Sequence, residues 1–280
     1  KGHVEVVRML LEQGADIDKA RNGGRTPLFA ASGNGHVEVV RMLLEQGADI
    51  DKAADDGATH LYAASHKGHV EVVRMLLEQG ADIDKARNGG RTPLFAASGN
   101  GHVEVVRMLL EQGADIDKAR NGGYTPLFIA SENGHEDVVR MLLEQGADIN
   151  KAMDDGWTPL LMASLKGHVE VARLLIEAGA DIDKATDNGC TPLYVASDKG
   201  DVDVARLLIE AGADIDKAKD GGATPLYMAS QNGHVDVARL LIKAGADIDK
   251  AKDGGYTPLY VASQQGHVDV ARLLIKAGAD

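Results

Sequence analysis

A strict period of 33 residues constrains the fold of this 280-residue chain more than any other feature of its sequence. The dipeptide Gly-His marks the period from Gly2-His3 to Gly266-His267, and only Asp201 replaces the histidine. Length alone would suggest one or two globular domains, but a fixed period overrides that estimate. A fixed period of this length indicates a repeat array. In such an array each unit packs only against its neighbours.

The repeat over residues 26–58 predicts two helices followed by a loop. Thr26 followed by Pro27 is typical of a helix start, and Gly35 is typical of a helix end. The pattern predicts a second helix over 37–46 that is apolar except for one narrow polar stripe, so we expect it to be buried on most sides. The Gly- and Asp-rich segment that follows favours a turn or hairpin. Neither helix can bury its apolar side chains alone, whereas stacked repeats can.

The repeated residues resemble those of a known family. Each unit reads Thr-Pro-Leu-x-x-Ala-x-x-x-Gly-His and then Val-x-x-Leu-Leu-x-x-Gly-Ala-Asp, and this pattern on this period resembles the ankyrin repeat along the whole chain. The resemblance implies an all-α solenoid of stacked helix–turn–helix units joined by hairpin loops. It also implies a concave groove, formed by hairpin tips and first helices, that usually binds other proteins.

We therefore expect a single array over residues 1–280. It would begin with a partial repeat at 1–25 that lacks its first helix. The eight full repeats would start near residues 26, 59, 92, 125, 158, 191, 224 and 257.

Several positions depart from the family pattern. His60 takes the place of the helix-starting proline, so we expect this helix start to be the weakest. The residue after Thr-Pro-Leu, usually His in the family, is here aromatic in seven repeats and Leu161 in the eighth. Because this aromatic ladder is periodic, we expect it to serve the core or helix packing rather than a ligand cage.

Composition narrows the classes of partner and the setting. The net charge of −13 argues against nucleic acid or an anionic membrane surface as the main partner. No apolar run approaches the ~18 residues that span a bilayer, so we expect no membrane insertion. A single cysteine, Cys190, excludes an internal disulfide framework, and no Asn-x-Ser/Thr sequon is present. Both observations favour an intracellular, cytoplasmic setting.

The periodic polar residues favour structural roles over chemistry. One histidine per repeat forms a divergent row that cannot bring several ligands to one metal ion, so we expect a structural histidine at the start of each second helix. Aspartate pairs such as Asp16 and Asp18 lack the extra ligands of a calcium loop, and we expect a solvated edge whose charge Lys19 and its equivalents neutralise.

Arginines such as Arg41 follow an acid three residues earlier, here Glu38, which predicts a solvated outer face. Every candidate nucleophile recurs as a repeat position. We therefore expect no metal, no cofactor and no catalytic residues; enzyme activity would need a catalytic domain outside this segment.

The residues that break the period are the candidates for binding a partner. They lie before each helix-starting Thr and near the end of each first helix, positions that the resemblance places in the groove. Aromatic residues and Arg dominate interface energetics, so we expect a hot spot around Trp157, with incidental variation as the alternative. The predicted partner-binding residues are Tyr124, Met153, Trp157, Met162, Leu165, Lys166, Cys190, Arg91 and Tyr256.

An internal duplication favours a second function. Residues 1–53 are identical to residues 67–119, so length rather than a unique surface could be what matters, as in a spacer or elastic segment of a larger protein. The first function, non-catalytic binding of a protein whose identity the sequence leaves open, is favoured by the concentration of Tyr124 and Trp157.

Two further expectations concern the ends of the chain and one side chain. Neither end carries the polar cap that solenoids need, so we expect a fragment of a longer array, or ends covered by a partner or by end-to-end self-association. We also expect the first helix to fray. Finally, Asn150 in the segment Asp148-Ile149-Asn150 resembles sites of asparaginyl hydroxylation in ankyrin repeats.

Overall fold

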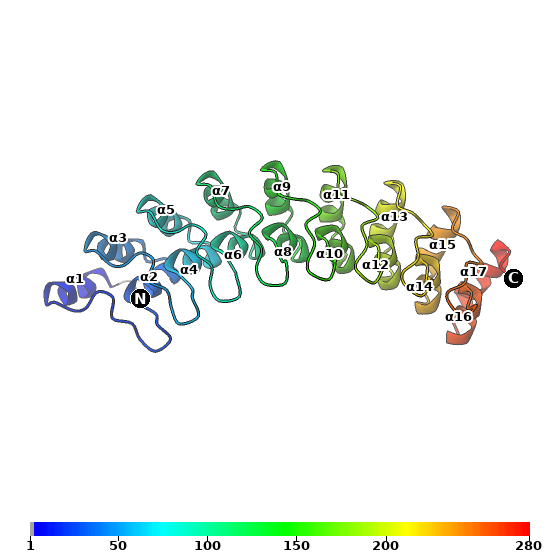
Figure 1. Ribbon diagram of the computed structural model, residues 1–280, viewed down its shortest axis with the longest axis horizontal. Coiled ribbons are helices and arrows are strands. Elements are labelled where there is room, and N and C mark those ends of the chain that lie inside the picture. Colours follow the sequence, from blue (N-terminus) through cyan, green and yellow to red (C-terminus); the bar gives the residue numbers. More distant parts are fainter. Residues whose placement is uncertain (1–2) are drawn as a thin grey trace. The chain divides into compact units, whose positions relative to one another are not determined.

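A computed structural model describes residues 3–280, and over this range the chain forms 17 helices and no strands. Short first helices alternate with second helices, as the repeat pattern predicts (Figure 1). The first helices are α2 (Pro27–Gly33), α4 (His60–Lys67), α6 (Pro93–Gly99), α8 (Pro126–Glu132), α10 (Pro159–Lys166), α12 (Pro192–Lys199), α14 (Pro225–Asn232) and α16 (Pro258–Gln265). The second helices are α1 (Val4–Glu12), α3 (Val37–Glu45), α5 (Val70–Glu78), α7 (Val103–Glu111), α9 (Glu136–Glu144), α11 (Val169–Glu177), α13 (Val202–Glu210), α15 (Val235–Lys243) and α17 (Val268–Ala277).

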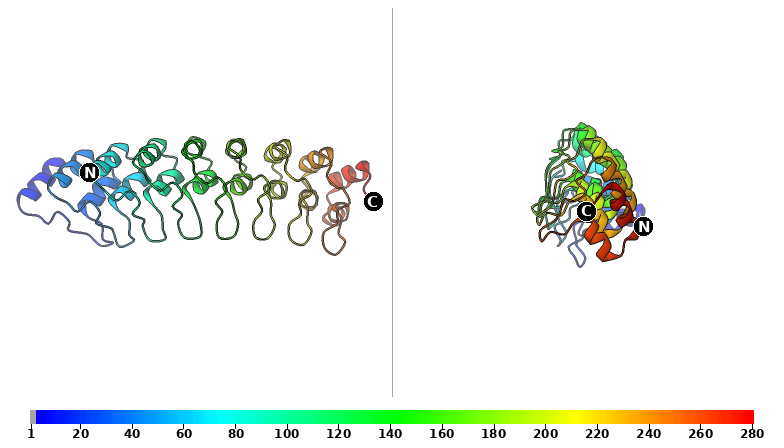
Figure 2. Two further views of the ribbon diagram at one scale, coloured as in Figure 1. Left: turned by 45° about the horizontal axis from the view of Figure 1, so that its top comes forward. Right: turned by 90° about the vertical axis from the view of Figure 1, so that its right-hand side faces the viewer.

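The chain divides into two compact units, which we call unit 1, up to Asp148, and unit 2, from Ile149 to Asp280. In each unit the first helices pack side by side in one row, the second helices pack in another, and the loops project on one side (Figure 2). This arrangement confirms the predicted all-α repeat fold. The single array over 1–280 stays a prediction.

The first helices begin where the sequence predicts because a threonine caps each of them. The hydroxyl of Thr92, for example, accepts a hydrogen bond from the backbone N–H of Phe95 at 3.1 Å, and the equivalent bond recurs in every full repeat. Such caps contribute about 1 kcal/mol each. Proline occupies the first helical position in seven of the eight first helices, where its missing N–H costs nothing.

The core runs between the two rows of helices in each unit. Leu94 on α6 and Val105, Val106 and Leu109 on α7 have no exposed surface, and their equivalents in the neighbouring repeats are likewise buried. The aromatic ladder belongs largely to this core, with Phe128 fully buried. Its core role is therefore confirmed in the inner repeats, whereas Tyr260 in the last one is 49% exposed.

Helix α1 differs from the other second helices because it has no buried residue. Val6, Met9 and Leu10 are about half exposed, whereas Val105 and Leu109 at two of the equivalent positions of α7 are completely buried. The local sequences of α1 and α7 are identical. The difference in burial therefore arises from tertiary contacts and not from the local sequence.

We expect the amide hydrogens of residues 6–11 to exchange at least about tenfold faster than those of residues 105–110 in the chain of residues 1–280, because local opening of α1 exposes little new apolar surface. The identical sequences give the two helices matched intrinsic exchange rates. Segmental isotope labelling would separate their signals in NMR hydrogen-exchange measurements. Equal protection of the two segments would contradict this prediction.

Candidate functional site

The Gly-His histidines bind the backbone of the preceding repeat. The Nε2 atom of His102 donates to the carbonyl of His66 at 3.1 Å, and the corresponding bond is present for His69, His135, His234 and His267. The expected structural role is thereby confirmed for these residues. Within residues 3–280, no three His, Cys, Asp or Glu side chains are grouped so that they could hold a metal ion.

The aspartate pairs connect successive repeats, a role that the sequence did not indicate. The carboxylate of Asp51 accepts the backbone N–H of Asp82 in the next repeat at 3.1 Å and 3.3 Å. Lys85 donates through Nζ to the main-chain carbonyl of Asp51 at 3.0 Å, so its direct contact is with the backbone and not, as expected, with a carboxylate. The same backbone bond recurs for Lys52, Lys184, Lys217 and Lys250.

Asn150, the predicted hydroxylation site, takes the aspartate's place in this ladder. Its Oδ1 accepts the backbone N–H of Asp181 at 2.9 Å. Asn150 is half-buried. Its hydroxylation stays a prediction, and the side chain already accepts a hydrogen bond from the next repeat.

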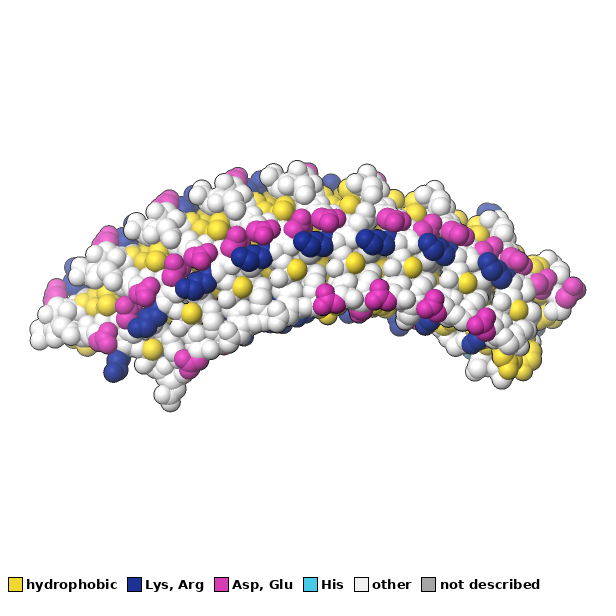
Figure 3. Space-filling model, viewed as in Figure 1, with side chains coloured by type: hydrophobic (Ala, Val, Ile, Leu, Met, Phe, Trp, Pro, Cys, Tyr) yellow, Lys and Arg dark blue, Asp and Glu magenta, His cyan; other side chains and the backbone are white. Residues whose placement is uncertain are grey.

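The arginine ladder on the second helices is an exposed row of ion pairs, as expected. Arg41 lies 3.7 Å from Glu38 and Arg74 lies 3.5 Å from Glu71, with all four side chains about half or more exposed. Figure 3 shows regular rows in which acidic side chains lie directly beside basic ones on the face in view. These rows therefore present no field of a single sign.

In unit 1 the hairpins and first helices between residues 21 and 87 line an open cleft of about 530 Å³. Arg25 and Phe29 line this cleft together, and His66 and Lys67 line it from the next repeat. These are positions that break the period, and the structure brings them together. Sequence reasoning missed Arg21 and Arg87, which come from the hairpin stems four residues before the predicted positions.

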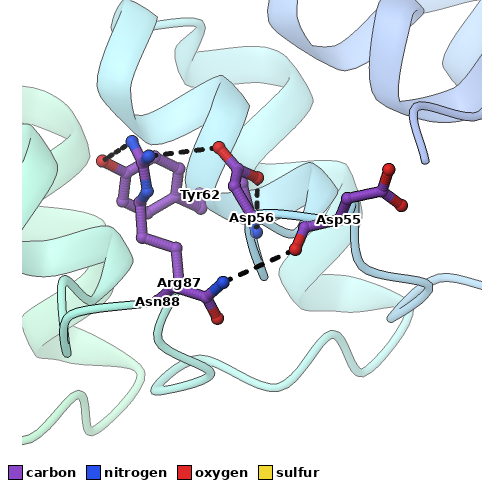
Figure 4. A network of polar contacts seen from close by, with 6 residues as sticks. Asp55, Asp56, Tyr62, Arg87 and Asn88 are labelled. Carbon is purple, nitrogen blue, oxygen red and sulfur yellow. Dashed lines mark hydrogen bonds and ion pairs between the residues drawn. The ribbon is translucent and has the colours of Figure 1, made fainter. Parts of the chain in front are cut away.

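A polar network fixes the centre of this cleft (Figure 4). The guanidinium of Arg87 lies 3.1 Å from the carboxylate of Asp56 and donates to the hydroxyl of Tyr62 at 3.5 Å. That hydroxyl, and more weakly the charge of Asp56, raise the pKa of Arg87 above its usual value. The ring of Tyr62 also stacks on His66. Arg87 is thus held in one orientation over an aromatic surface.

Tyr124, also in unit 1, is a half-buried ring between fixed neighbours. The guanidinium of Arg120 lies 3.6 Å from its centroid, and the ring of Phe128 meets it edge-on at 5.1 Å. Arg91 is exposed. Both residues are thus placed where a partner can reach them.

In unit 2, Trp157 and Leu165 pack against a buried cluster that contains Leu161 and Tyr194. Both remain partly exposed, as do Met153 and Met162, whereas Lys166 and Tyr256 are exposed. The structure brings Trp157 and Leu165 together on this cluster. Met153 lies next to them, because its backbone N–H donates to the carbonyl of Trp157 at 2.8 Å.

Cys190 belongs to the same cluster and is only 9% exposed. Its backbone N–H donates to the hydroxyl of Thr186 at 3.0 Å. Its neighbour Tyr194 is buried as well, and burial raises the pKa of Tyr194 to about 12. Of the predicted binding residues, Cys190 therefore has the least surface to offer a partner.

His60 is a fully buried histidine. Its Nδ1 donates to the carbonyl of Ile50 at 2.6 Å, and its Nε2 lies 3.0 Å from the hydroxyl of Thr26 in the preceding repeat. A neutral ring satisfies both contacts, because Nε2 then accepts the hydroxyl proton. These two bonds offset the loss of the proline at this helix start. Burial lowers the pKa of His60, since the charged form is desolvated.

Comparison with models of protein families gives four matches to one description, ankyrin repeats in three copies, over residues 1–87, 83–153, 150–219 and 214–280. Together these matches span the chain. The chain matches none of the curated proteins with which it was compared. None of the helices found between residues 3 and 280 is both long and apolar enough to cross a bilayer.

In four Gly-His pairs, at Gly35, Gly68, Gly101 and Gly233, the glycine lies against the histidine ring of the next repeat. A Cβ at Gly68 would lie 2.6 Å from Nδ1 of His102, whereas one at Gly80, also at positive φ, would meet nothing within 4 Å. We expect Gly80→Ala to lose about 1–2 kcal/mol of unfolding free energy through backbone strain. Gly68→Ala should lose about 1–3 kcal/mol more through overpacking. Urea unfolding of the two variants tests this difference, and equal losses would contradict it.

We expect the buried His60 to make the stability of the chain depend on pH. Its folded-state pKa lies below its ordinary value of 6.5, so the unfolded chain binds more protons, and stability is lost as the pH falls below about 6.5. The variant His60→Pro restores the residue of the other seven repeats and should lose less stability between pH 7 and pH 5. Urea unfolding at both pH values measures this difference. Identical pH dependence in the two proteins would refute it.

Proposed function

The chain belongs to the ankyrin-repeat family, and on that premise we propose that it recognises a partner protein, without catalysis, through side chains of its hairpins and first helices. Ankyrin repeats are generally protein-interaction modules and are typically non-catalytic. A reducing, cytoplasmic setting is part of the proposal, supported by the single, buried cysteine.

One observation carries the proposal: several side chains that break the period, among them Arg91, Tyr124 and Trp157, are accessible. The periodic threonines cap helices and the periodic leucines are buried. Trp157 and Tyr124, in contrast, are half-buried rings that pack against neighbouring side chains. A supported, partly exposed aromatic ring is typical of an interface hot spot, because it loses little conformational freedom on binding.

The alternative is a spacer, which the identity of residues 1–53 and 67–119 favours. A spacer would need regular stacking but no particular residue at positions 124 and 157. The two functions therefore differ in what truncation of these rings does. If the chain is a spacer, truncation of either ring would leave its binding to other proteins unchanged.

We expect Trp157→Ala and Tyr124→Ala to weaken binding of the partner by about fivefold or more each, which corresponds to more than ~1 kcal/mol. The partner would be isolated from the native host with the unaltered chain, identified, and titrated by calorimetry against each variant. Arg173→Ala is the matched control, because Arg173 lies in the Trp157 repeat but on the exposed ion-pair row beside Glu170. We expect that control to change affinity by less than about 1 kcal/mol.

Losses below about 1 kcal/mol for both aromatic variants would refute binding through these residues and favour the spacer. Urea unfolding of each variant would verify that the repeats remain folded.

A further inference from the structure

We propose that the cleft between residues 21 and 87 of unit 1 binds an extended acidic peptide, with carboxylates on its arginines and apolar side chains on its aromatic floor. The inference rests on the proposed function and specifies the chemistry of the partner that this part of the face accepts. It is argued from the charge, the floor and the fixed geometry of the cleft.

The cleft is basic although the chain as a whole is strongly acidic. Its charged lining consists of Arg21, Arg25, Lys67 and Arg87 against a single acid, Asp56. Asp56 is paired with Arg87, whereas no carboxylate of the described residues lies within ion-pair distance of Arg21, Arg25 or Lys67. Three cations therefore gather in one hollow of a molecule with a net charge of −13, which favours an anionic occupant.

The titration of His66 agrees with a positive field at this place. Burial contributes most to lowering the pKa of His66, and the charges of Lys67, His102, Arg87 and Arg91 lower it further. The attraction for carboxylates therefore rests on the permanently charged lysine and arginines.

The cations of the cleft are placed on aromatic rings. The guanidinium of Arg25 lies 5.4 Å from the centroid of Phe29, and that of Arg87 lies 5.4 Å from the centroid of Tyr62. Guanidinium groups are weakly hydrated, present paired donors to a carboxylate and, when stacked, lose little freedom on binding. The ring of Phe29 thus positions a fork that fits a Glu or Asp side chain, whereas Arg87, bound to Asp56 and Tyr62, adds positive charge beside it.

Between these two positions the floor of the cleft is apolar. Phe29 and Ala30 on α2 and Ala63 on α4 line it, and Phe29 is only partly buried. Side chains of an extended strand alternate in direction, so every second residue of a peptide can reach this floor while its neighbours reach the arginines. A pattern of alternating acidic and apolar residues fits both features.

The occupant favoured here is a peptide rather than a nucleic acid. A polyanion needs a continuous basic track, whereas second-helix arginines such as Arg41 and Arg74 are paired with acids. The cleft holds a few cations and is bordered by the exposed acid Asp55. Its size suits a short peptide segment, because small-ligand sites span about 300–1,000 Å³.

In the first two repeats of unit 2 the residues at the corresponding positions are different in character, whereas Lys219 and Lys252 in the later repeats again lie over aromatic rings. Met153 and Trp157 stand where unit 1 has Arg87 and Arg91, and Thr186 and Cys190 follow in the next repeat. The preference for acidic peptides is therefore expected of unit 1, while the Trp157 surface contacts other parts of a partner.

The test uses the full chain and fluorescence anisotropy. The probes are a fluorescein-labelled peptide of alternating Glu and Leu, its counterpart with Gln in place of Glu, and a labelled oligouridylate. We expect the Glu peptide to bind at least about tenfold more tightly than the Gln peptide, with an affinity that falls as salt increases.

The double variant Arg25→Gln/Arg87→Gln should weaken binding of the Glu peptide by at least about tenfold, because it removes two positive charges from the cleft. The matched control Arg41→Gln/Arg74→Gln removes the same charge from the outer faces of neighbouring repeats and should change affinity by less than about threefold. Since Arg87 also holds Asp56, a second variant, Arg21→Gln/Lys67→Gln, removes two cations that carry no ion pair and should also weaken binding.

Equal effects of the cleft and control variants, equal affinity for the Glu and Gln peptides, or no saturable binding would each overturn the inference. Tighter, cleft-dependent binding of the oligouridylate would overturn it in favour of a nucleic-acid surface. Any of these results, together with a native partner whose binding depends on Trp157 or Tyr124, would leave protein recognition standing and remove only the acidic preference.

Discussion

Burial of apolar side chains between successive repeats is the interaction on which the rest of the structure depends. The helices are 7 to 10 residues long, which is too short for stability in isolation. Leu94, Val105 and Leu109 become fully buried only because a repeat lies on each side of them. The equivalents of Val105 and Leu109 in α1, Val6 and Leu10, are about half exposed, because α1 packs against the second helix of one neighbouring repeat, α3. Stability is thus a property of neighbouring repeats rather than of any one of them.

Polar contacts then fix the register of that stacking. Histidines such as His102 reach a backbone carbonyl of the preceding repeat, and hairpin aspartates such as Asp51 reach a backbone N–H of the following one. Both are directional, so they restrict how far one repeat can slide over the next. Residues that looked like candidates for metal binding therefore maintain the geometry of the scaffold, and His60 adds one more such contact at a repeat that lacks proline.

This division of labour leaves function to the irregular positions. Residues that recur in every repeat are mostly buried or hydrogen-bonded within the array, so few of their atoms are available to a partner. The exceptions, Arg25, Tyr124 and Trp157 among them, lie on the hairpin and first-helix side with supported, accessible side chains. Unit 1 offers arginines on aromatic rings, whereas unit 2 offers an indole on an apolar cluster. One scaffold thus carries two chemically distinct surfaces.

The sequence by itself determined the helices, their caps, the core leucines and valines and the family, because each follows from residues close together within one repeat. It did not determine which irregular residues share a cleft, nor that Cys190 is buried. Those facts depend on contacts between repeats, and the partners lie 25 residues apart for Tyr62 and Arg87, 31 for Asp51 and Asp82 and 36 for His66 and His102. None of these separations equals the period of 33, since the two partners of each contact occupy different positions within their repeats. Only the tertiary structure could therefore place Arg87 beside Tyr62 and assemble the basic cleft.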